Sequence, residues 1–472
     1  MRVKRSGGAV FAGLLAACVW MVVRQASAAA AGSPAAGPGA ACSGHALASA
    51  RALARGDYQA AGKDFAPAIA RQFPPAKIRQ AWDSVQASAG GYQRLGEAEQ
   101  RRIDGRPVVV IPVGFSHAPW VFVYACNGDN EITRARLMPA TQLDEAAAAE
   151  RKAAQGKIPI KPRTLADGVR VEPLSVPSPY GPLRGVLTLP AGKGPFPAMV
   201  LVGGSGPNDL DEAVGGSRPF RDIAEGLAAV GIASLRYDKR QTDYPFRMAA
   251  DASLTVDQEE TDDALTAAHL LAKQPQVDPN RVFVLGHSEG AMLAPRIGRR
   301  DPALAGIIMM AAPARKLLAV IREQTHEQGR RLGLPKEQIE KSEKALTAEY
   351  KLLDAADPNH PPAGSFAGAP QSWWLSVHDY DQVAVAESLS MPILVLQGGS
   401  DFQVSTRNDF DAWKRALAGH ANVTFHLYPG LSHLFTPAGR SLTTADYARP
   451  AHVDPAVIRE IAAWINSQRS PG

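Results

Sequence analysis

The feature that most constrains the fold is an apolar run, residues 282–285, that leads directly into the pentad Gly286-His287-Ser288-Glu289-Gly290. A strand that turns sharply into a helix holds the central serine in strained backbone geometry, and side chains at the flanking positions would clash. Glycine at both flanks removes this clash. The pattern therefore predicts a strand, a tight turn and a helix, with the Ser288 hydroxyl exposed at the carboxyl end of a sheet. The serine backbone would lie at a helix N-terminus, where N–H groups favour negative charge.

Strand-like and helix-like runs alternate from residue 166 to the C-terminus. We expect strands at residues 198–202, 232–237, 281–285, 305–310, 393–397 and 423–428, and helices at residues 220–230, 256–273 and 457–467. This alternation predicts an α/β fold with a doubly wound, mostly parallel sheet over residues 166–472. Residues 314–390 interrupt it with charged sequence of helical period, and we expect them to form a helical cap insertion. Trp373 and Trp374 in this insertion would either line a substrate pocket or pack in an ordinary core.

The N-terminal part of the chain has a different pattern. Residues 43–141 contain two or three helix-like runs followed by strand-like runs, which is typical of a small α+β domain. Residues 142–165 are Ala-rich and charged at first and then hold Pro, Lys and Ile, and we place a linker there.

Residues 1–28 have the pattern of a secretory signal peptide. A basic start (Arg2, Lys4 and Arg5) precedes the apolar residues 9–23 and a cleavage site ending at Ala28. The apolar run is short of the about 20 residues that a membrane span needs. We therefore expect a periplasmic or secreted protein. The alternative is a lipoprotein with a lipid anchor at Cys18, but the apolar run continues beyond this cysteine, which favours soluble export.

Two cysteines, Cys42 and Cys126, remain after signal removal. In an oxidising compartment an even pair predicts a disulfide, and the alternative is two buried thiols. The 51 basic and 46 acidic residues form no basic stripe, which argues against a nucleic-acid partner. The sequence shows no H-E-x-x-H motif and no close cysteine cluster, so we predict neither a metal nor a cofactor.

A serine hydroxyl needs a base within hydrogen-bond reach and an acid that orients this base. His433 is the best candidate base, because it lies in a Pro-Gly loop just after the strand expected at residues 423–428. Asp401 is the candidate acid, since it follows the strand expected at residues 393–397. His420 and His426 come earlier in the chain, and His287 is expected to be a packing residue because it cannot easily reach back to the neighbouring serine.

Developing negative charge on a substrate oxygen requires two preset donors. We expect one to be the backbone N–H of Glu289, directly after the serine. The other should come from the glycine-rich loop at residues 203–207, where the N–H of Ser205 is our first choice and that of Gly204 the neighbouring one. The loop carries no lysine-bearing phosphate-binding pattern.

The stretch from residue 166 to the C-terminus resembles the α/β-hydrolase superfamily, in particular bacterial serine esterases of the dienelactone hydrolase-like and acyl-CoA thioesterase-like branch. The segments that carry the resemblance are residues 203–209, 236–240, 286–290, 401–404 and 432–435. The resemblance implies that Ser288 is the nucleophile, Asp401 the acid and His433 the base. Gly203 stands where many relatives carry histidine. The N-terminal segment is similar to a small domain of unknown function that often precedes such hydrolases and is thought to have a cone-like fold.

Together these features predict a secreted serine hydrolase that cleaves carboxylic esters with short to medium acyl chains, which are small-molecule substrates. One alternative is a peptidase or thioesterase with the same three residues. A periplasmic location argues against acyl-CoA, and residues 43–141 are too few for the propeller that usually precedes related peptidases. Another alternative is a binding module whose hydrolase fold is inactive, which an intact serine, acid and histidine disfavour.

Overall fold

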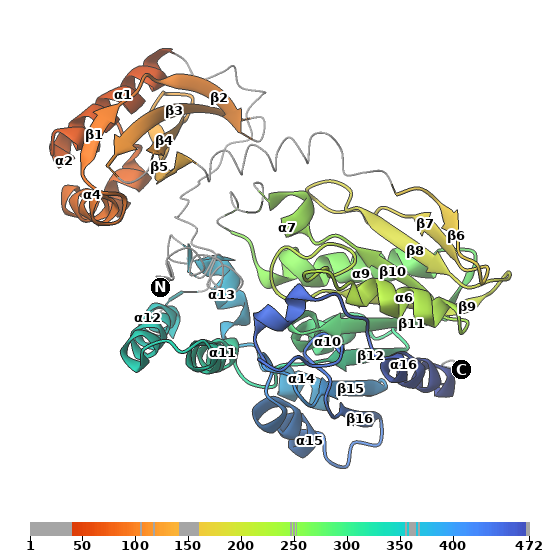
Figure 1. Cartoon of the computed structure of the whole chain (residues 1–472). Helices are drawn as coiled ribbons and strands as arrows, with labels where there is room; N and C mark the ends of the chain where they lie inside the picture. The colour runs from red at the N-terminus through yellow and green to blue at the C-terminus, as the bar shows by residue number, and fades with distance from the viewer. Residues whose placement is uncertain are drawn as a thin grey trace, which may run out of the picture.

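The computed structural model describes residues 40–103, 106–116, 119–140, 160–245, 248, 251, 253–354, 356–357, 365–366 and 369–468. The signal peptide expected at residues 1–28, the alternative anchor at Cys18 and most of the linker expected at residues 142–165 lie outside these ranges. Within the described ranges, a five-stranded sheet lies in the N-terminal segment and a nine-stranded sheet in the C-terminal segment (Figure 1). None of the described helices is both long and apolar enough to cross a membrane.

The N-terminal segment places helices against one face of an antiparallel sheet. Its elements are α1 (Ala40–Ala54), α2 (Tyr58–Ala61), α3 (Pro67–Gln72), α4 (Pro75–Ala89), β1 (Tyr92–Leu95), β2 (Glu99–Ile103), β3 (Arg106–Phe115), β4 (Pro119–Cys126) and β5 (Ile132–Pro139). Strands pair in the order β1-β3-β4-β5, and β2 also pairs with β3. Alternate residues of β3 share a core with Trp82 of α4. Cys42 and Cys126 form a disulfide that joins α1 to the end of β4.

The nine-stranded sheet has the order β16-β15-β12-β11-β9-β10-β8-β7-β6. Its parallel strands are β9 (Phe196–Val202), β10 (Ala233–Tyr237), β11 (Val277–His287), β12 (Gly306–Met310), β15 (Ile393–Gly398) and β16 (Val423–Tyr428). Three antiparallel strands extend one edge, namely β8 (Gly185–Leu189), β7 (Arg170–Pro173) and β6 (Arg163–Thr164). The predicted doubly wound, mostly parallel sheet is confirmed. The carboxyl ends of its parallel strands meet at one edge, where open α/β sheets bind ligands.

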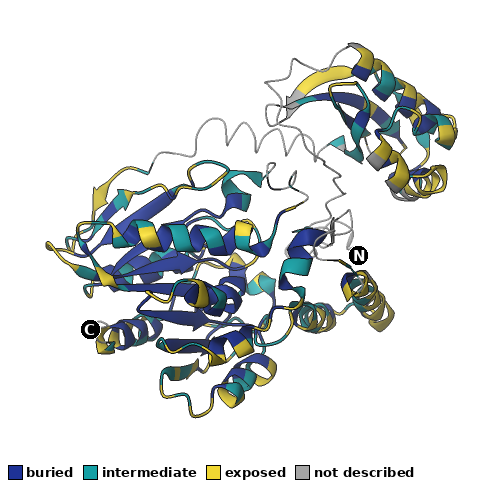
Figure 2. Cartoon of the chain, turned by 180° about the vertical axis from the view of Figure 1, so that it is seen from behind, coloured by how far each residue is buried: buried dark blue, intermediate teal, exposed yellow. Residues whose placement is uncertain are grey.

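Both faces of this sheet are buried, as strands of a parallel sheet require (Figure 2). Val200 of β9 and Val284 of β11 face one core, which α9 (Asp262–Ala272), α10 (Glu289–Arg300) and α15 (Asp411–Ala416) also line. Met199 and Phe283, the preceding residues on these strands, face a second core, which is closed by α6 (Pro219–Ala228) and α16 (Pro455–Ser467). Shorter helical elements are α7 (Arg240–Asp243), η2 (Thr406–Phe410), η3 (Thr444–Ala448) and the π-helical turn η1 (Asp257–Thr261) before α9.

The insertion expected at residues 314–390 is mainly helical. It holds α11 (Leu317–Arg331), α12 (Lys336–Asp354), β13 (Ser365–Phe366), β14 (Ala369–Pro370), α13 (Gln371–His378) and α14 (Gln382–Glu387). Trp373 and Trp374 of α13 are 5% and 3% exposed and share a core with α12 and with Met292 of α10. The structure therefore does not support the substrate-pocket role for these two residues. Burying their large apolar rings holds the insertion against α10, so they have the packing role that was the alternative.

Candidate active site

Ser288 occupies the sharp turn between β11 and α10. Its backbone has φ 53° and ψ −112°, a left-handed conformation that is strained for a residue with a side chain. A Cβ atom on Gly286 would lie 2.1 Å from the Gly290 carbonyl oxygen, and one on Gly290 would lie 2.5 Å from the Val202 oxygen. Both glycines are thus required by close backbone approach. The turn is further held by the Ser288 N–H, which donates to Met310 O of β12 at 2.9 Å.

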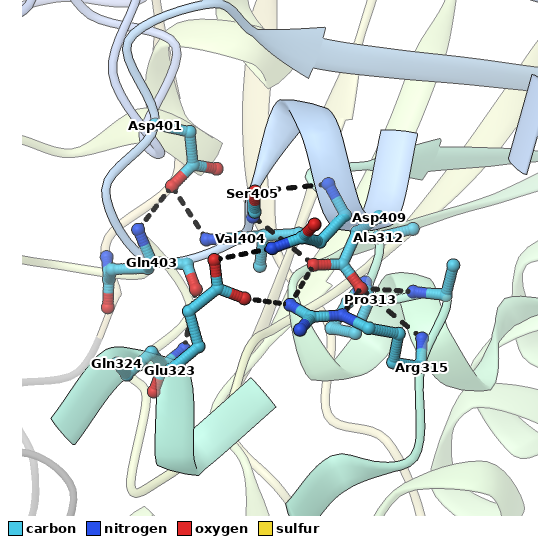
Figure 3. A network of polar contacts seen from close by, with 12 residues as sticks. Ala312, Pro313, Arg315, Glu323, Gln324, Asp401, Gln403, Val404, Ser405 and Asp409 are labelled. Carbon is cyan, nitrogen blue, oxygen red and sulfur yellow. Dashed lines mark hydrogen bonds and ion pairs between the residues drawn. The ribbon is translucent and has the colours of Figure 1, made fainter. Parts of the chain in front are cut away.

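Asp401 and His433 meet at the same edge of the sheet, from the loops after β15 and β16. His433 Nδ1 lies 2.7 Å from Asp401 Oδ2, and the two side chains are 5% and 0% exposed. Asp401 Oδ1 accepts from the backbone N–H groups of Gln403 and Val404 at 2.7 and 2.9 Å (Figure 3). These donors hold the carboxylate in place, so that it can accept from Nδ1 and leave Nε2 as the basic atom.

The third member of the predicted set, Ser288, is not hydrogen-bonded to the base. In the part of the chain that the structure describes, neither Ser288 Oγ nor His433 Nε2 has a hydrogen-bond partner. The loop of His433 is nevertheless fastened beside the serine, because the ring of His287 donates from Nε2 to His433 O at 2.9 Å. Such serine–histidine bonds are often long before a substrate binds. The earlier candidate His426 lies elsewhere, on β16 and 3.9 Å from Glu460.

His287 is not the simple packing residue that the sequence suggested. Its Nδ1 lies 2.8 Å from Glu212 Oε1, and both side chains are buried. Burial by itself lowers the pKa of His287, but the Glu212 carboxylate and the acceptor contacts outweigh burial and raise this pKa above its ordinary value. An imidazole that donates to a carbonyl from Nε2 and pairs with a carboxylate through Nδ1 is favoured in its charged form. Glu212 thus holds the buried ring of His287 directly before the serine.

The glycine-rich loop after β9 lies against the serine, but its amides differ in availability. Gly204 N donates to Glu212 Oε1 at 2.7 Å. The alternative prediction, that the Gly204 N–H is an oxyanion donor, was therefore wrong, because this N–H is already bound to a carboxylate. The N–H of Ser205 has no acceptor among the described residues, and Ser205 is exposed. The N–H of Glu289 lies in the first turn of α10, where helical amides have no intrahelical acceptor. Ser205 and Glu289 therefore offer two free backbone donors near Ser288.

A buried lysine, which the sequence did not single out, lies behind these donors. Lys239 Nζ is 2.8 Å from Gly204 O, 3.4 Å from Glu289 Oε1 and 2.5 Å from Glu260 Oε2. The carboxylates of Glu259, Glu260 and Glu289 are close enough together to suit a metal ion. In this structure the Lys239 ammonium lies among them and supplies the positive charge.

Asp409 ties the start of the insertion to the loop that carries Asp401. Its buried carboxylate accepts from the backbone N–H of Ala314 at 3.0 Å and from that of Ser405 at 3.3 Å. It also forms two bonds with the Arg315 guanidinium, at 3.0 and 2.7 Å (Figure 3). Arg315 in turn pairs with Glu323 of α11. The position of the acid loop therefore depends on the insertion as well as on β15.

The fold, and the order of the candidate nucleophile, acid and histidine along the chain, are those of α/β-hydrolases. Residues 216–436 match the family described as serine aminopeptidase, S33. Over 284 residues the chain is 40% identical to Esterase EstD of Thermotoga maritima, a match that covers 60% of this chain and 65% of that relative. The chain thus spans just under two thirds of the relative's length. The resemblance to serine esterases of the α/β-hydrolase superfamily is confirmed.

Solved structures with a similar fold include Est1E from Butyrivibrio proteoclasticus, at 14% identity and a TM-score of 0.40, covering 63% of this chain and 98% of that chain. A puromycin-hydrolyzing peptidase of Mycobacterium tuberculosis is similar at 15% identity and a TM-score of 0.43, covering 77% of this chain and 45% of that chain.

Proposed function

We propose that this protein is a serine hydrolase that cleaves carboxylic esters of short to medium acyl chains. The observation that carries the proposal is the hydrogen-bonded pair of Asp401 and His433, whose loop is bound by His287, the residue directly before Ser288 in its strained turn. The free N–H groups of Ser205 and Glu289 add the donors that acyl transfer needs. The name of the relative Esterase EstD supports ester hydrolysis in particular.

The chemistry follows from this geometry. Ser288 Oγ attacks the ester carbonyl carbon while His433 Nε2 takes the hydroxyl proton, and Asp401 stabilises the resulting imidazolium. The carbonyl oxygen becomes an oxyanion that accepts from the N–H groups of Ser205 and Glu289. His433 then protonates the alcohol oxygen, and the ester C–O bond breaks. The alcohol departs, and the acyl group remains bound to Ser288 Oγ. A water molecule, deprotonated by the same imidazole, cleaves the acyl-enzyme and restores the hydroxyl.

Export is part of the proposal. Residues 1–28 have the signal-peptide pattern, and the disulfide between Cys42 and Cys126 fits an oxidising compartment. A periplasmic or secreted enzyme meets esters from the surroundings of the cell and not acyl-CoA. Secretion is tested by expressing the full chain and a chain without residues 1–28, and comparing the N-terminal mass and the compartment of the product.

The activity is tested with p-nitrophenyl esters from acetate to octanoate, with wild type beside Ser288→Ala. We expect turnover that favours the shorter chains and falls by at least about 10³-fold in the variant, because the remaining groups cannot form the acyl-enzyme. Turnover that survives the substitution would refute the serine mechanism. The profile of kcat/KM against chain length then measures the size of the acyl site.

The family description favours a second candidate, a peptidase that removes N-terminal residues. The same three residues would cleave an amide through the same acyl-enzyme. Aminoacyl p-nitroanilides and the matching aminoacyl p-nitrophenyl esters separate the two proposals. An enzyme that cleaves the esters alone is an esterase, and one that also cleaves the anilides with comparable kcat/KM is a peptidase.

A further inference from the structure

The buried ammonium of Lys239 contacts both segments that present the candidate oxyanion donors. Its Nζ donates to Gly204 O, in the peptide that carries the Ser205 N–H, and pairs with the carboxylate of Glu289, whose own N–H is the other donor. We propose that Lys239 is a positioning residue that sets the direction and the spacing of the two oxyanion donors. This proposal rests on the proposed function, since it concerns the same site.

The direction of the Ser205 N–H follows from the geometry of one peptide plane. Gly204 C=O and Ser205 N–H belong to the same trans peptide, in which the two bonds point in opposite directions. Lys239 Nζ and Asn208 Nδ2 bind Gly204 O at 2.8 and 2.9 Å. Both donors hold the Gly204 carbonyl on their own side of the peptide. The N–H of Ser205 therefore points away from Lys239 and Asn208.

The loop is also held by the backbone of the same lysine. Lys239 N donates to Asn208 O at 3.1 Å, so Lys239 and Asn208 brace each other as well as the Gly204 carbonyl. Lys239 follows the last residues of β10, which is the neighbour of β9 in the sheet. The lysine therefore transmits the rigid geometry of the sheet to a loop that has no regular structure of its own.

The contact with Glu289 fixes the second donor relative to the first. Glu289 is the first residue of α10, and its carboxylate lies 3.4 Å from Lys239 Nζ. Glu260 Oε2 lies 2.5 Å from the same ammonium and adds a third contact that restrains the lysine. All three side chains are at most 7% exposed, so water does not screen these interactions.

The ammonium has an electrostatic effect in addition to its geometric one. A positive charge on the carbonyl end of a peptide polarises the N–H at the other end, which makes this N–H a stronger donor to an oxyanion. The negative charge of the three nearby carboxylates is smaller than their number suggests. Desolvation raises the pKa of Glu260 to about 8 and that of Glu259 to about 7, so part of the acidic set is protonated at neutral pH.

The test is Lys239→Met, assayed with p-nitrophenyl butyrate and with a fluorophosphonate. The latter is attacked at phosphorus by Ser288 Oγ, which forms a P–O bond and expels fluoride. We expect kcat to fall 10²–10³-fold, as it does when one oxyanion donor is lost, with KM changed less than about 3-fold. The second-order labelling rate of Ser288 should fall by a similar factor, because the phosphoryl oxygen uses the same donors.

The matched control is Asp263→Asn, which weakens a buried ion pair with Arg240, the residue next to Lys239. This pair touches neither Gly204 nor Glu289, so kcat and the labelling rate should stay within about 3-fold of wild type. If both variants lose kcat equally, Lys239 has a general structural role and the proposal is overturned. A folded Lys239→Met enzyme with wild-type kcat overturns it directly.

A second variant covers the case in which Lys239→Met does not fold. Glu289→Gln keeps the backbone N–H but removes one charge that holds the lysine, and we expect kcat to fall about 10-fold with KM unchanged. An unchanged kcat in this variant would then overturn the proposal. The proposed function can fail without the Lys239 proposal. A wild type that is labelled at Ser288 but hydrolyses no ester refutes esterase activity. The labelling rates of wild type and variant still measure the effect of Lys239 in that case. A wild type that is not labelled refutes both.

Discussion

Replacing Gly290 by alanine tests whether the turn around Ser288 depends on close backbone approach. The added Cβ would lie 2.5 Å from Val202 O and 2.6 Å from Gly203 O, at the end of β9. Both atoms belong to the backbone, so no side chain can move aside. Real Cβ contacts stay beyond 3.0 Å, and α10 must therefore move away from β9 by about 0.5 Å.

Two opposing terms set the loss of stability. Overpacking a tight contact costs about 1–3 kcal/mol. Alanine is better than glycine inside a helix by about 0.5–1 kcal/mol, which offsets part of this cost. We therefore expect the free energy of unfolding to fall by about 1–2 kcal/mol, measured by urea titration of wild type and variant.

The expected loss of activity is larger than the loss of stability suggests. The movement of α10 carries Ser288 and the Glu289 N–H away from the loop of Ser205. Because a displacement of 1 Å can cost about 10²-fold in rate, half this displacement predicts a fall in kcat/KM of about 10-fold. The assay is p-nitrophenyl butyrate hydrolysis, with the active enzyme counted by fluorophosphonate labelling.

Gly298→Ala is the matched control, because Gly298 lies on the same helix. Its Cβ would meet Met391 Sδ at 3.0 Å and Ile307 Cγ2 at 3.4 Å, both on side chains that can adjust. We expect stability within about 1 kcal/mol of wild type, since the gain in helix propensity offsets the contact, and kcat/KM within about 2-fold. Wild-type kinetics in Gly290→Ala, or equal damage in Gly298→Ala, would refute the reasoning.

Three further predictions concern stability. Desolvation raises the pKa of Glu260 from 4.5 to about 8, so between these pH values the folded state keeps a proton that the unfolded state releases. The free energy of unfolding should therefore fall as pH rises from about 4.5 to 8. In urea titrations, Glu260→Gln should flatten this pH dependence. Asp409→Asn removes the buried carboxylate that binds Arg315 and should cost about 1–3 kcal/mol, because Arg315 keeps its pair with Glu323. Glu323→Gln, at a half-buried site, should cost less than about 1 kcal/mol. Equal costs by chemical denaturation would contradict this. The disulfide Cys42–Cys126 closes a sequence separation of 84 residues. Replacing both cysteines by serine should lower the free energy of unfolding of the N-terminal segment, measured by calorimetry, by up to about 4.5 kcal/mol. The value of kcat/KM should stay at that of wild type.

The turn and the acid–base pair could be predicted because each leaves a local signal in the sequence. The pentad around Ser288 follows an apolar strand, and Asp401 and His433 each come just after another. In a parallel sheet, residues that follow strands meet at one edge, so their contact needed no further information. This explains why the 2.7 Å bond between His433 and Asp401 joins two residues that were chosen from the sequence alone.

The polar contacts around the turn left no such signal. Glu212 is 75 residues from His287, and Lys239 is 35 residues from Gly204. A charged residue next to a strand is usually solvated, and nothing in its spacing shows that it is buried. The Gly204 amide was a wrong choice for the same reason, because its acceptor comes from the side chain of Glu212. Trp373 stayed ambiguous since an aromatic residue suits a pocket and a core equally well.

These long-range contacts also explain why glycine is sufficient at position 203. A Cβ on Gly203 would lie 3.4 Å from the Asn208 Cβ, an ordinary van der Waals contact, so the backbone does not require glycine here. The backbone of Gly204 is instead held by side chains: Glu212 binds Gly204 N, and Lys239 and Asn208 bind Gly204 O. Since both ends of residue 204 are held by buried side chains, the direction of the Ser205 N–H does not depend on a side chain at position 203. A loop that is stabilised in this way keeps its donor without a side chain at this position.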